Sequence, residues 1–256
     1  MKTPTLSMHV TAGILHGLLV LAATAVSAQG ADVTLGVDGW TPYFHSGTTD
    51  TSATVVGNDY KVSYDTEASA SIGRAYRNWD IAAIPLTSPF TVEFDFRSNT
   101  NVASALQTFV IFGSSAQSQS TGPNDSWKIT ADGGGWGVYN NNTYASLGTG
   151  SILADVTWRF TLTIDPVADT YRVDVTNLST SNTWSLAGLA LRNGSDTSLS
   201  FLNFVSNGAA SQTGLGFSVG EISITTTAVP EPHAAALVLG GILLAGVLAR
   251  RCRLKA

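Results

Sequence analysis

The stretch that decides the fold is residues 156–165, VTWRFTLTID, followed after a short turn by residues 169–177, DTYRVDVTN. Apolar side chains occupy every second position of both runs, and threonine or charged side chains fill most of the positions between them. Side chains of a β-strand point alternately to opposite faces, so each run predicts a strand with one buried face. Pro166 favours a turn between the runs, which together predict a β-hairpin.

The same alternation extends outward from this hairpin. Residues 90–96, FTVEFDF, place three phenylalanines and a valine on one face. In residues 216–226 the apolar set changes from odd to even positions at Gly220-Glu221, which predicts a β-bulge there. About ten to fourteen short strands with one apolar face predict two packed antiparallel sheets. The remaining predicted strands are residues 61–64, 108–113, 127–131, 136–140 and 200–205.

The succession of FTVEFDF, a polar loop, WKI and the WRFTLTIDP hairpin resembles concanavalin A-like and laminin-G-like domains. The resemblance rests on strand rhythm over residues 55–226 and on no invariant motif. It implies an all-β fold, a two-sheet antiparallel jelly-roll sandwich. An immunoglobulin-like sandwich is the main alternative, but the chain has no Cys-Trp-Cys arrangement to support it.

The two ends of the chain differ in composition from the middle. Residues 14–26 are an apolar run that ends in Val26-Ser27-Ala28, small residues that suit a signal peptidase. We therefore interpret residues 1–28 as a signal peptide with an N-terminal signal helix. A buried first helix or a membrane anchor is the alternative, although the run is short for a membrane span.

The C-terminal residues 228–256 begin with a proline-acid-proline motif. Each proline disfavours helix in the residue before it, so the motif predicts an extended segment that a protease can bind. The residues of this sorting motif are Pro230, Glu231 and Pro232.

An uncharged run and a basic tail follow the motif. Residues 234–249 predict a C-terminal transmembrane helix, which at about 1.5 Å per residue covers about 24 Å. The basic tail contains Arg250, Arg251 and Arg253, and the positive-inside rule keeps it in the cytoplasm. The rest of the protein is therefore expected on the other side of the membrane.

The order of Val-Pro-Glu-Pro, a short Gly- and Ala-rich apolar run and an arginine cluster resembles the PEP-CTERM sorting signal of Gram-negative bacteria. The resemblance implies processing by signal peptidase and by an exosortase, a membrane cysteine protease, in organisms that usually make an exopolysaccharide. It implies export across the inner membrane, transient anchoring by the C-terminal helix, and then a place at the cell surface or in the extracellular matrix. An ordinary C-terminal anchor behind a proline linker is the alternative.

Between the two ends, residues 29–227 are long enough for one domain with a full core. This part contains eight basic and seventeen acidic residues, so its net charge is about −9. That balance argues against nucleic acid or an anionic membrane surface as a partner, and leaves neutral glycans, cations and other proteins. The only cysteine, Cys252, lies in the basic tail, so the domain contains no disulfide.

Residues that could carry catalysis are few. Glu93 and Asp95 share one strand face and resemble the Glu-x-Asp of laminarinase-type glycosidases, in which a third acid follows on the same strand. Arg97 and Ser98 occupy that place here, so the acid/base is missing and we expect a solvated face on which Arg97 offsets the two acids. With His45 as the domain's sole histidine, zinc and Ser-His-Asp chemistry lack support, and the protein is predicted not to be an enzyme.

Calcium is the one cofactor left open, because its ligands are carboxylates and carbonyls. The candidate residues are Asp125, Asp132 before three glycines, and Asp165 with Asp169. Ordinary turns explain the same residues and no EF-hand loop is present, so no cofactor is predicted.

The stretch that most favours binding is residues 126–148, SWKITADGGGWGVYNNNTYASLG. It combines aromatic and amide side chains, and sugars bind to aromatic faces flanked by amide donors and acceptors. Core packing is the alternative, although Trp136 and Tyr139 differ in parity, so at least one aromatic ring is expected to face outward. The candidate glycan-binding residues are Trp127, Trp136, Tyr139 and Tyr144.

Together these features predict an exported, non-catalytic cell-surface or matrix protein with a structural or adhesive role and an exopolysaccharide as its candidate ligand. Two alternatives remain, a carbohydrate-active enzyme of the concanavalin A-like fold and an ice-binding protein. Ice binding needs a flat array of threonines, and Thr225-Thr226-Thr227 is too short to form one.

Overall fold

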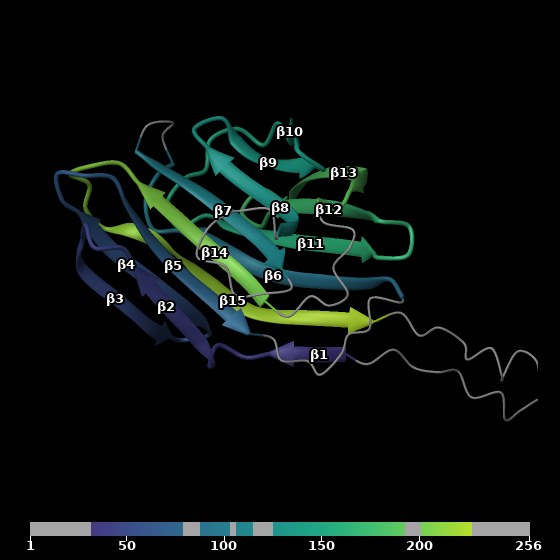
Figure 1. The fold of residues 1–256 in the computed structure, drawn as a ribbon, viewed down its shortest axis with the longest axis horizontal. Helices are drawn as coiled ribbons and strands as arrows, with labels where there is room; N and C mark the ends of the chain where they lie inside the picture. Colours follow the sequence, from purple (N-terminus) through teal and green to yellow (C-terminus); the bar gives the residue numbers. More distant parts are fainter. Residues whose placement is uncertain (1–31, 79–87, 103–105, 115–124, 193–200, 227–256) are drawn as a thin grey trace, which may run out of the picture. The chain divides into compact units, whose positions relative to one another are not determined.

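The described part of the chain is all β (Figure 1). The computed structural model describes residues 32–78, 88–102, 106–114, 125–192 and 201–226, with the backbone alone for Asp32 and residues 74–78. These residues form fifteen strands and belong to one compact unit, residues 31–227. The predicted signal helix, sorting motif, transmembrane helix and basic tail lie outside them. In the described residues, no helix is long and apolar enough to cross a membrane.

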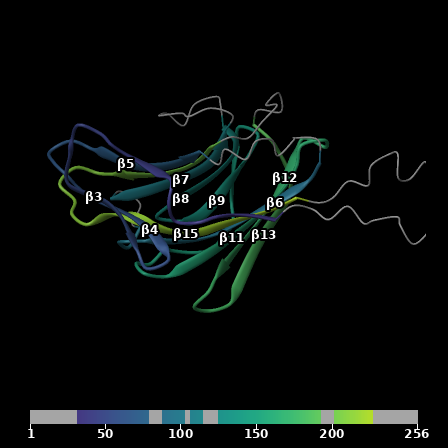
Figure 2. The same ribbon diagram turned by 90° about the horizontal axis from the view of Figure 1, so that it is seen from below.

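The strands form two antiparallel sheets. Sheet A has eight strands, in the order β13 (Asn182–Ala190), β12 (Thr170–Asn177), β11 (Thr157–Asp165), β6 (Phe90–Ser98), β15 (Leu215–Thr226), β4 (Asp59–Thr66) and β3 (Thr48–Val56), with β1 (Asp32–Leu35) beside β15. Sheet B has seven, in the order β10 (Thr143–Ser146), β9 (Gly135–Asn140), β8 (Asp125–Asp132), β7 (Gln107–Ser114), β14 (Phe201–Gly208), β5 (Ser71–Asn78) and β2 (Trp40–Phe44). Figure 2 shows the sheets as two layers. The two-sheet antiparallel sandwich is confirmed, and it exceeds the roughly seven to nine strands of an immunoglobulin-like sandwich.

The chain passes repeatedly from one sheet to the other. In sheet A the strands β6, β15 and β4 are neighbours, and in sheet B the strands β7, β14 and β5 are neighbours. The connections from β4 to β5, β5 to β6, β6 to β7 and β14 to β15 therefore all cross between the sheets. Strands that pair in the centre of each sheet thus come from distant parts of the chain, which is the connection pattern of a jelly roll.

The hairpin of β11 and β12 confirms the strand pair predicted from the alternating sequence. Leu162 pairs with Val173, and both side chains are fully buried. The turn is closed by Asp165, whose Oδ1 accepts hydrogen bonds from the backbone N–H groups two and three residues later, at 3.0 and 2.9 Å. β6 alternates in the same way, with buried and half-buried side chains along all nine residues.

Aromatic rings fill the space between the sheets. Phe94 of sheet A meets Phe204 of sheet B with ring centroids 5.1 Å apart, and Phe96 meets Trp136 at 5.4 Å. Both contacts are edge-to-face, an arrangement that aromatic pairs favour because of the charge distribution of the ring. The core that holds the two sheets together is therefore largely aromatic.

The predicted β-bulge at Gly220-Glu221 is confirmed, because the register of β15 against β6 shifts there. Val219 pairs with Phe96 and Ile222 pairs with Phe94, so two residues of β15 stand opposite a single residue of β6. The extra residue keeps the apolar side chains of β15 on the core face both before and after the bulge.

Candidate binding face of sheet B

Two of the four candidate glycan-binding residues are wrong, because Trp127 and Trp136 are fully buried. Both lie on the inner face of sheet B, where Trp136 meets Phe160 of sheet A with ring centroids 4.7 Å apart. Gly113 makes room for Trp127, since a Cβ atom at that glycine would come within 2.4 Å of the indole. Trp127 lies two residues from the core residue Ile129, and Trp136 lies two residues from Val138, so both rings point to the core face. Neither indole offers a face to a sugar.

Tyr139 and Tyr144, the other two candidates, lie on the outer face of sheet B. They stand opposite each other in the β9–β10 hairpin, with ring centroids 5.9 Å apart. Tyr144 is 43% exposed. Its ring covers Gly137, where a Cβ atom would come within 2.4 Å of it. Because β10 is the last strand of sheet B, the two rings form an aromatic surface at the edge of the sheet.

The turn between β9 and β10 is fixed by hydrogen bonds to the segment that ends β13. The backbone N of Asn141 donates to the carbonyl of Ala190 (2.9 Å), and Ala190 N donates to Oδ1 of Asn140 (2.8 Å). Arg192 Nη2 donates to Oδ1 of Asn142 (3.2 Å). These bonds use the side-chain oxygens of two asparagines, so the NH₂ groups of the same amides keep their donor capacity for a ligand.

A buried ion pair lies beside this turn. Arg192 Nη1 donates to Oδ2 of Asp125 at 2.8 Å, and the two side chains are 15% and 0% exposed. The register between β7 and β8 shifts between Gly113 and Ser114, so that Ser114 pairs with Asp125 and β8 contains one extra residue. This bulge places Asp125 on the outer face together with Lys128, although their spacing of three positions would otherwise put them on opposite faces.

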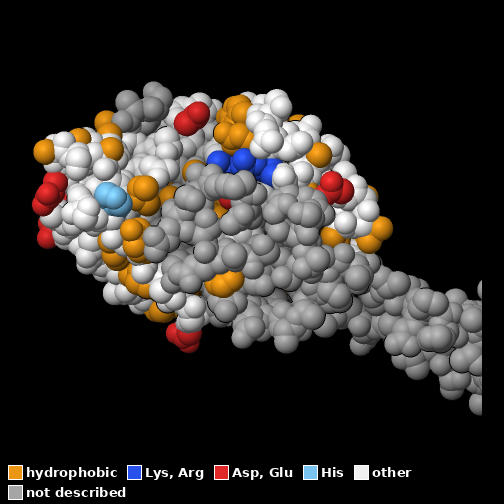
Figure 3. Space-filling view, in the orientation of Figure 1, with side chains coloured by type: hydrophobic (Ala, Val, Ile, Leu, Met, Phe, Trp, Pro, Cys, Tyr) orange, Lys and Arg blue, Asp and Glu red, His pale blue; other side chains and the backbone are white. Residues whose placement is uncertain are grey.

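Tyr139 is close to two cations. Its ring centroid is 4.8 Å from Lys128 Nζ and 5.1 Å from Arg192 Cζ, both within the range of cation–π attraction. Burial raises the pKa of Asp125 to about 6, although the charges of Arg192 and Lys128 act in the opposite direction. Burial also lowers the pKa of Lys128, which Asp125 partly offsets. In Figure 3 a group of Lys and Arg side chains lies next to hydrophobic side chains on this face.

Three buried polar atoms in this region have no hydrogen-bond partner among the described residues: Asp125 Oδ1, Arg192 Nε and Asn203 Oδ1. Asn203 belongs to β14, and its Nδ2 donates to Oγ of Ser114, the residue that pairs with Asp125. Buried polar atoms of native proteins nearly always have a partner, and atoms as deeply buried as these three are accessible to an enclosed water molecule rather than to a large ligand. Sequence reasoning missed Lys128, Arg192 and Asn203 as site residues, and the lysine inside the predicted strand WKI was the only local signal.

Three of the four aspartates considered for calcium have other roles in the structure. Asp125 pairs with Arg192, Asp132 Oδ1 accepts a hydrogen bond from Gly134 N at 2.9 Å, and Asp165 closes the β11–β12 turn. In the part of the chain that the structure describes, no three His, Cys, Asp or Glu side chains are grouped so that they could hold a metal ion.

The acids Glu93 and Asp95 lie on the outer face of sheet A, beside an open depression of about 290 Å³. Arg159, opposite Asp95 on β11, donates from Nε and Nη2 to the Asp95 carboxylate at 2.8 and 3.0 Å. Arg97 pairs instead with Asp59 of β4, so the expectation that Arg97 offsets the two acids is wrong. The reason is that Arg159 of β11 lies directly opposite Asp95 of β6, whereas Arg97 is two residues further along β6.

The comparison with known proteins gives similar folds only. No protein-family model and no curated protein matches the chain. A protein of unknown function from Shewanella oneidensis is 13% identical, covers 88% of this chain and 96% of its own, and has a TM-score of 0.48. A metal-free lectin from Griffonia simplicifolia is 12% identical over 77% of this chain and 100% of its own, with a TM-score of 0.47. The lectin-like defence protein arcelin-5 from Phaseolus vulgaris is 11% identical over 78% and 99%, with a TM-score of 0.46.

Proposed function

We propose that the chain is an exported, non-catalytic protein of the cell surface or extracellular matrix, and that its jelly-roll domain binds a polysaccharide with the β9–β10 hairpin. The observation that carries the proposal is the exposed ring of Tyr144, which lies over Gly137 and against Tyr139 at the edge of sheet B. The apolar face of a sugar ring packs on such a tyrosine, while its hydroxyl groups reach neighbouring amides.

The amides next to the ring are already held in place. Asn140 and Asn142 are bonded to Ala190 and Arg192, so the turn does not have to be ordered when a ligand arrives. A preorganised site loses less conformational entropy on binding. Among the described strands β10 lies at the edge of sheet B, so the tyrosine is not covered by a neighbouring strand of that sheet.

Binding of the full-length chain, purified in mild detergent, to a panel of bacterial polysaccharides tests this proposal. We expect Tyr144→Ala to weaken binding about tenfold or more, because it removes the exposed stacking surface. Tyr43→Ala is the matched control, since Tyr43 belongs to β2 at the opposite edge of the same sheet. Binding that both variants keep, or no binding to any polysaccharide, would contradict a binding role for the hairpin.

In this proposal residues 228–256 are a PEP-CTERM sorting signal that delivers the domain to the surface. The support is the order of parts in the sequence: the motif around Glu231, the uncharged run of residues 234–249 and the arginines that follow it. Signal peptidase and an exosortase are the processing partners, and the C-terminal helix holds the protein in the membrane until it is cut. The extended proline motif supplies the segment on which a protease acts.

Replacing Pro230, Glu231 and Pro232 with alanine tests the sorting role in cells. We expect the variant to keep its C-terminal tail and to stay in the membrane fraction, as measured by the mass of the intact protein. His233→Ala, directly after the motif, is the matched control and should be processed normally. Tail removal that continues at the normal rate in the triple variant rules out cleavage directed by this motif.

A further inference from the structure

We infer that the polysaccharide is an acidic one, and that Lys128, next to the positive charge of Arg192, binds the carboxylate group of a uronic acid residue. This inference rests on the function proposed above and names the ligand class of the same face. The juxtaposition that carries it is two cations on one tyrosine ring, beside the amides of the β9–β10 turn.

Lys128 is a cation in a poorly solvated place on this face. Its residue is 9% exposed, and its ammonium group lies 4.8 Å from the ring centroid of Tyr139. The nearby carboxylate of Asp125 forms its ion pair with Arg192, and within the described residues Lys128 has no ion pair. Charged groups removed from water are normally paired, so this ammonium group is suited to an anion that arrives with a ligand.

Arg192 extends the same positive region. Two of its nitrogens are used, Nη1 with Asp125 and Nη2 with Asn142, whereas Nε is buried without a partner among the described residues. Its guanidinium lies 5.1 Å from the ring centroid of Tyr139, the ring that Lys128 also contacts. Two cations and one carboxylate leave this region with a positive charge. Salt screens charges that lie more than about 8 Å away, so a ligand at this face responds chiefly to these nearby charges.

The amides of the β9–β10 turn fit the hydroxyl groups of the sugar. The side-chain oxygens of Asn140 and Asn142 are already bonded, so their NH₂ groups can donate to hydroxyl groups. A uronic acid residue offers both kinds of group, a carboxylate for Lys128 and hydroxyl groups for these amides. A neutral sugar would leave Lys128 unpaired, which makes the acidic sugar the better match.

The test is calorimetric titration of the full-length chain in mild detergent with oligomers of mannuronate, galacturonate and glucuronate. Each oligomer is also used after chemical reduction of its carboxylates to neutral alcohols. We expect at least one acidic oligomer to bind, and its reduced form to bind at least tenfold more weakly. Lys128→Met should reduce the affinity for the acidic oligomer about tenfold, and Lys128→Arg should keep the preference.

Lys61→Met is the matched control for Lys128→Met. Lys61 is an exposed lysine of β4 on the outer face of sheet A, so its replacement changes the net charge by the same amount. Thermal melting shows that each variant is folded. Equal affinities for acidic and reduced oligomers overturn the inference and leave the proposed function intact. No binding to any oligomer overturns the inference, and no binding across the polysaccharide panel overturns the proposed function as well. An equal loss in Lys61→Met and Lys128→Met overturns the inference by assigning the effect to net charge.

Discussion

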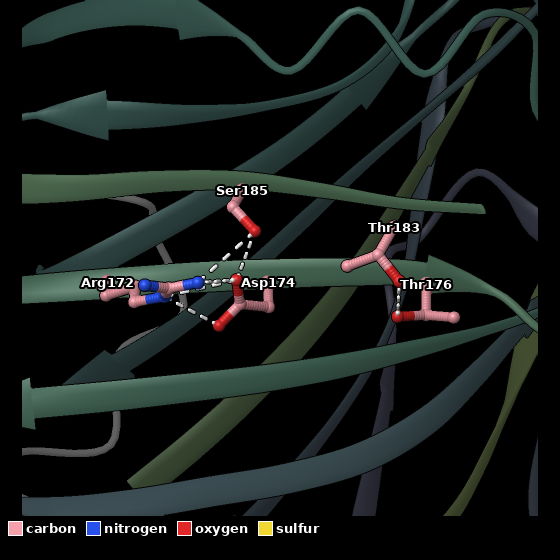
Figure 4. A network of polar contacts seen from close by, with 5 residues as sticks. All are labelled: Arg172, Asp174, Thr176, Thr183 and Ser185. Atoms are coloured by element: carbon pink, nitrogen blue, oxygen red, sulfur yellow. Dashed lines mark hydrogen bonds and ion pairs between the residues drawn. The ribbon is translucent and has the colours of Figure 1, made fainter. Parts of the chain in front are cut away.

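The outer faces of the two sheets carry the same kind of ion pair in opposite environments. On sheet A, Arg172 donates to Asp174 from Nε and Nη2 at 2.8 and 2.7 Å, and Ser185 bonds the same carboxylate (Figure 4). The side chains of Arg172 and Asp174 are 51% and 23% exposed. On sheet B, Arg192 bonds Asp125, whose side chain is fully buried.

Burial reverses the direction of the pKa shift between the two aspartates. The hydrogen bond from Arg172 lowers the pKa of Asp174, whereas burial raises the pKa of Asp125 to about 6 despite its own arginine. The carboxylate of Asp174 has its charge satisfied by neighbours on the protein. Asp125 keeps one oxygen without a partner among the described residues. The comparison teaches that the exposed pair satisfies its carboxylate completely, whereas the buried pair leaves one carboxylate oxygen without a partner among the described residues.

The largest expected difference between the faces is the effect of removing each arginine. Arg192→Met leaves the charge of Asp125 buried and uncompensated, so we expect the free energy of unfolding at pH 7 to fall by about 3–5 kcal/mol. Arg172→Met removes an exposed partner and should change stability little, because exposed ion pairs contribute little. Denaturant unfolding of both variants measures the difference. Equal effects would show that the two pairs do not differ in environment.

The pH dependence of stability should carry opposite signs on the two faces. The folded pKa of Asp125, about 6, lies above its ordinary value of 3.8, so its contribution to stability rises as pH falls from about 6 to about 4. Two pKa units correspond to roughly 3 kcal/mol. The folded pKa of Asp174 is lowered, so its contribution is present above its unfolded pKa and is lost as pH falls.

The two contributions can be separated by measuring the free energy of unfolding of the Asp125→Asn and Asp174→Asn variants between pH 4 and pH 7. Asp125→Asn should remove the gain in stability on acidification. Asp174→Asn should lose stability chiefly at neutral pH, with a smaller change. A gain on acidification that persists in Asp125→Asn would assign it to another group.

The sequence predicted the parts of the fold in which one face of a strand is buried and the other is not. The β11–β12 hairpin, β6 and the bulge at Gly220-Glu221 all follow from alternation between apolar and polar residues. In these strands each side chain either enters the core or contacts water. An apolar side chain therefore indicates the core face, and a polar one indicates the outer face.

Alternation failed in β8, because seven of its eight residues are buried or half-buried and the first five are all buried. With both faces covered, the parity of Trp127 does not show that it enters the core, nor that Lys128 faces outward. The bulge beside Ser114 and the approach of Asn203 depend on pairing between strands far apart in the chain. No local pattern encodes those pairings, so the charged part of the candidate face could not be predicted.

A smaller effect is expected from filling the space beneath the exposed tyrosine. In Gly137→Ala the new methyl group would lie within 2.4 Å of the Tyr144 ring and must displace it. We expect polysaccharide binding to weaken by roughly 1 kcal/mol, about fivefold, while the pH dependence caused by Asp125 stays unchanged. Gly36→Ala is the matched control, because no atom lies within 4 Å of a Cβ atom there. Unchanged binding in Gly137→Ala would show that the position of this ring does not matter.

The smallest effect is expected on sheet A, where the hydroxyl groups of Thr176 and Thr183 bond each other at 2.8 Å on the exposed face. Thr183→Ala removes one cross-strand hydrogen bond in contact with water, so we expect a loss of only about 0.5 kcal/mol in the free energy of unfolding. Binding of the polysaccharide should not change, because the polar groups of this face are satisfied by one another. A measurable loss of binding in this variant would place the ligand on sheet A, since no contact of Thr183 reaches the tyrosines of sheet B in the described residues.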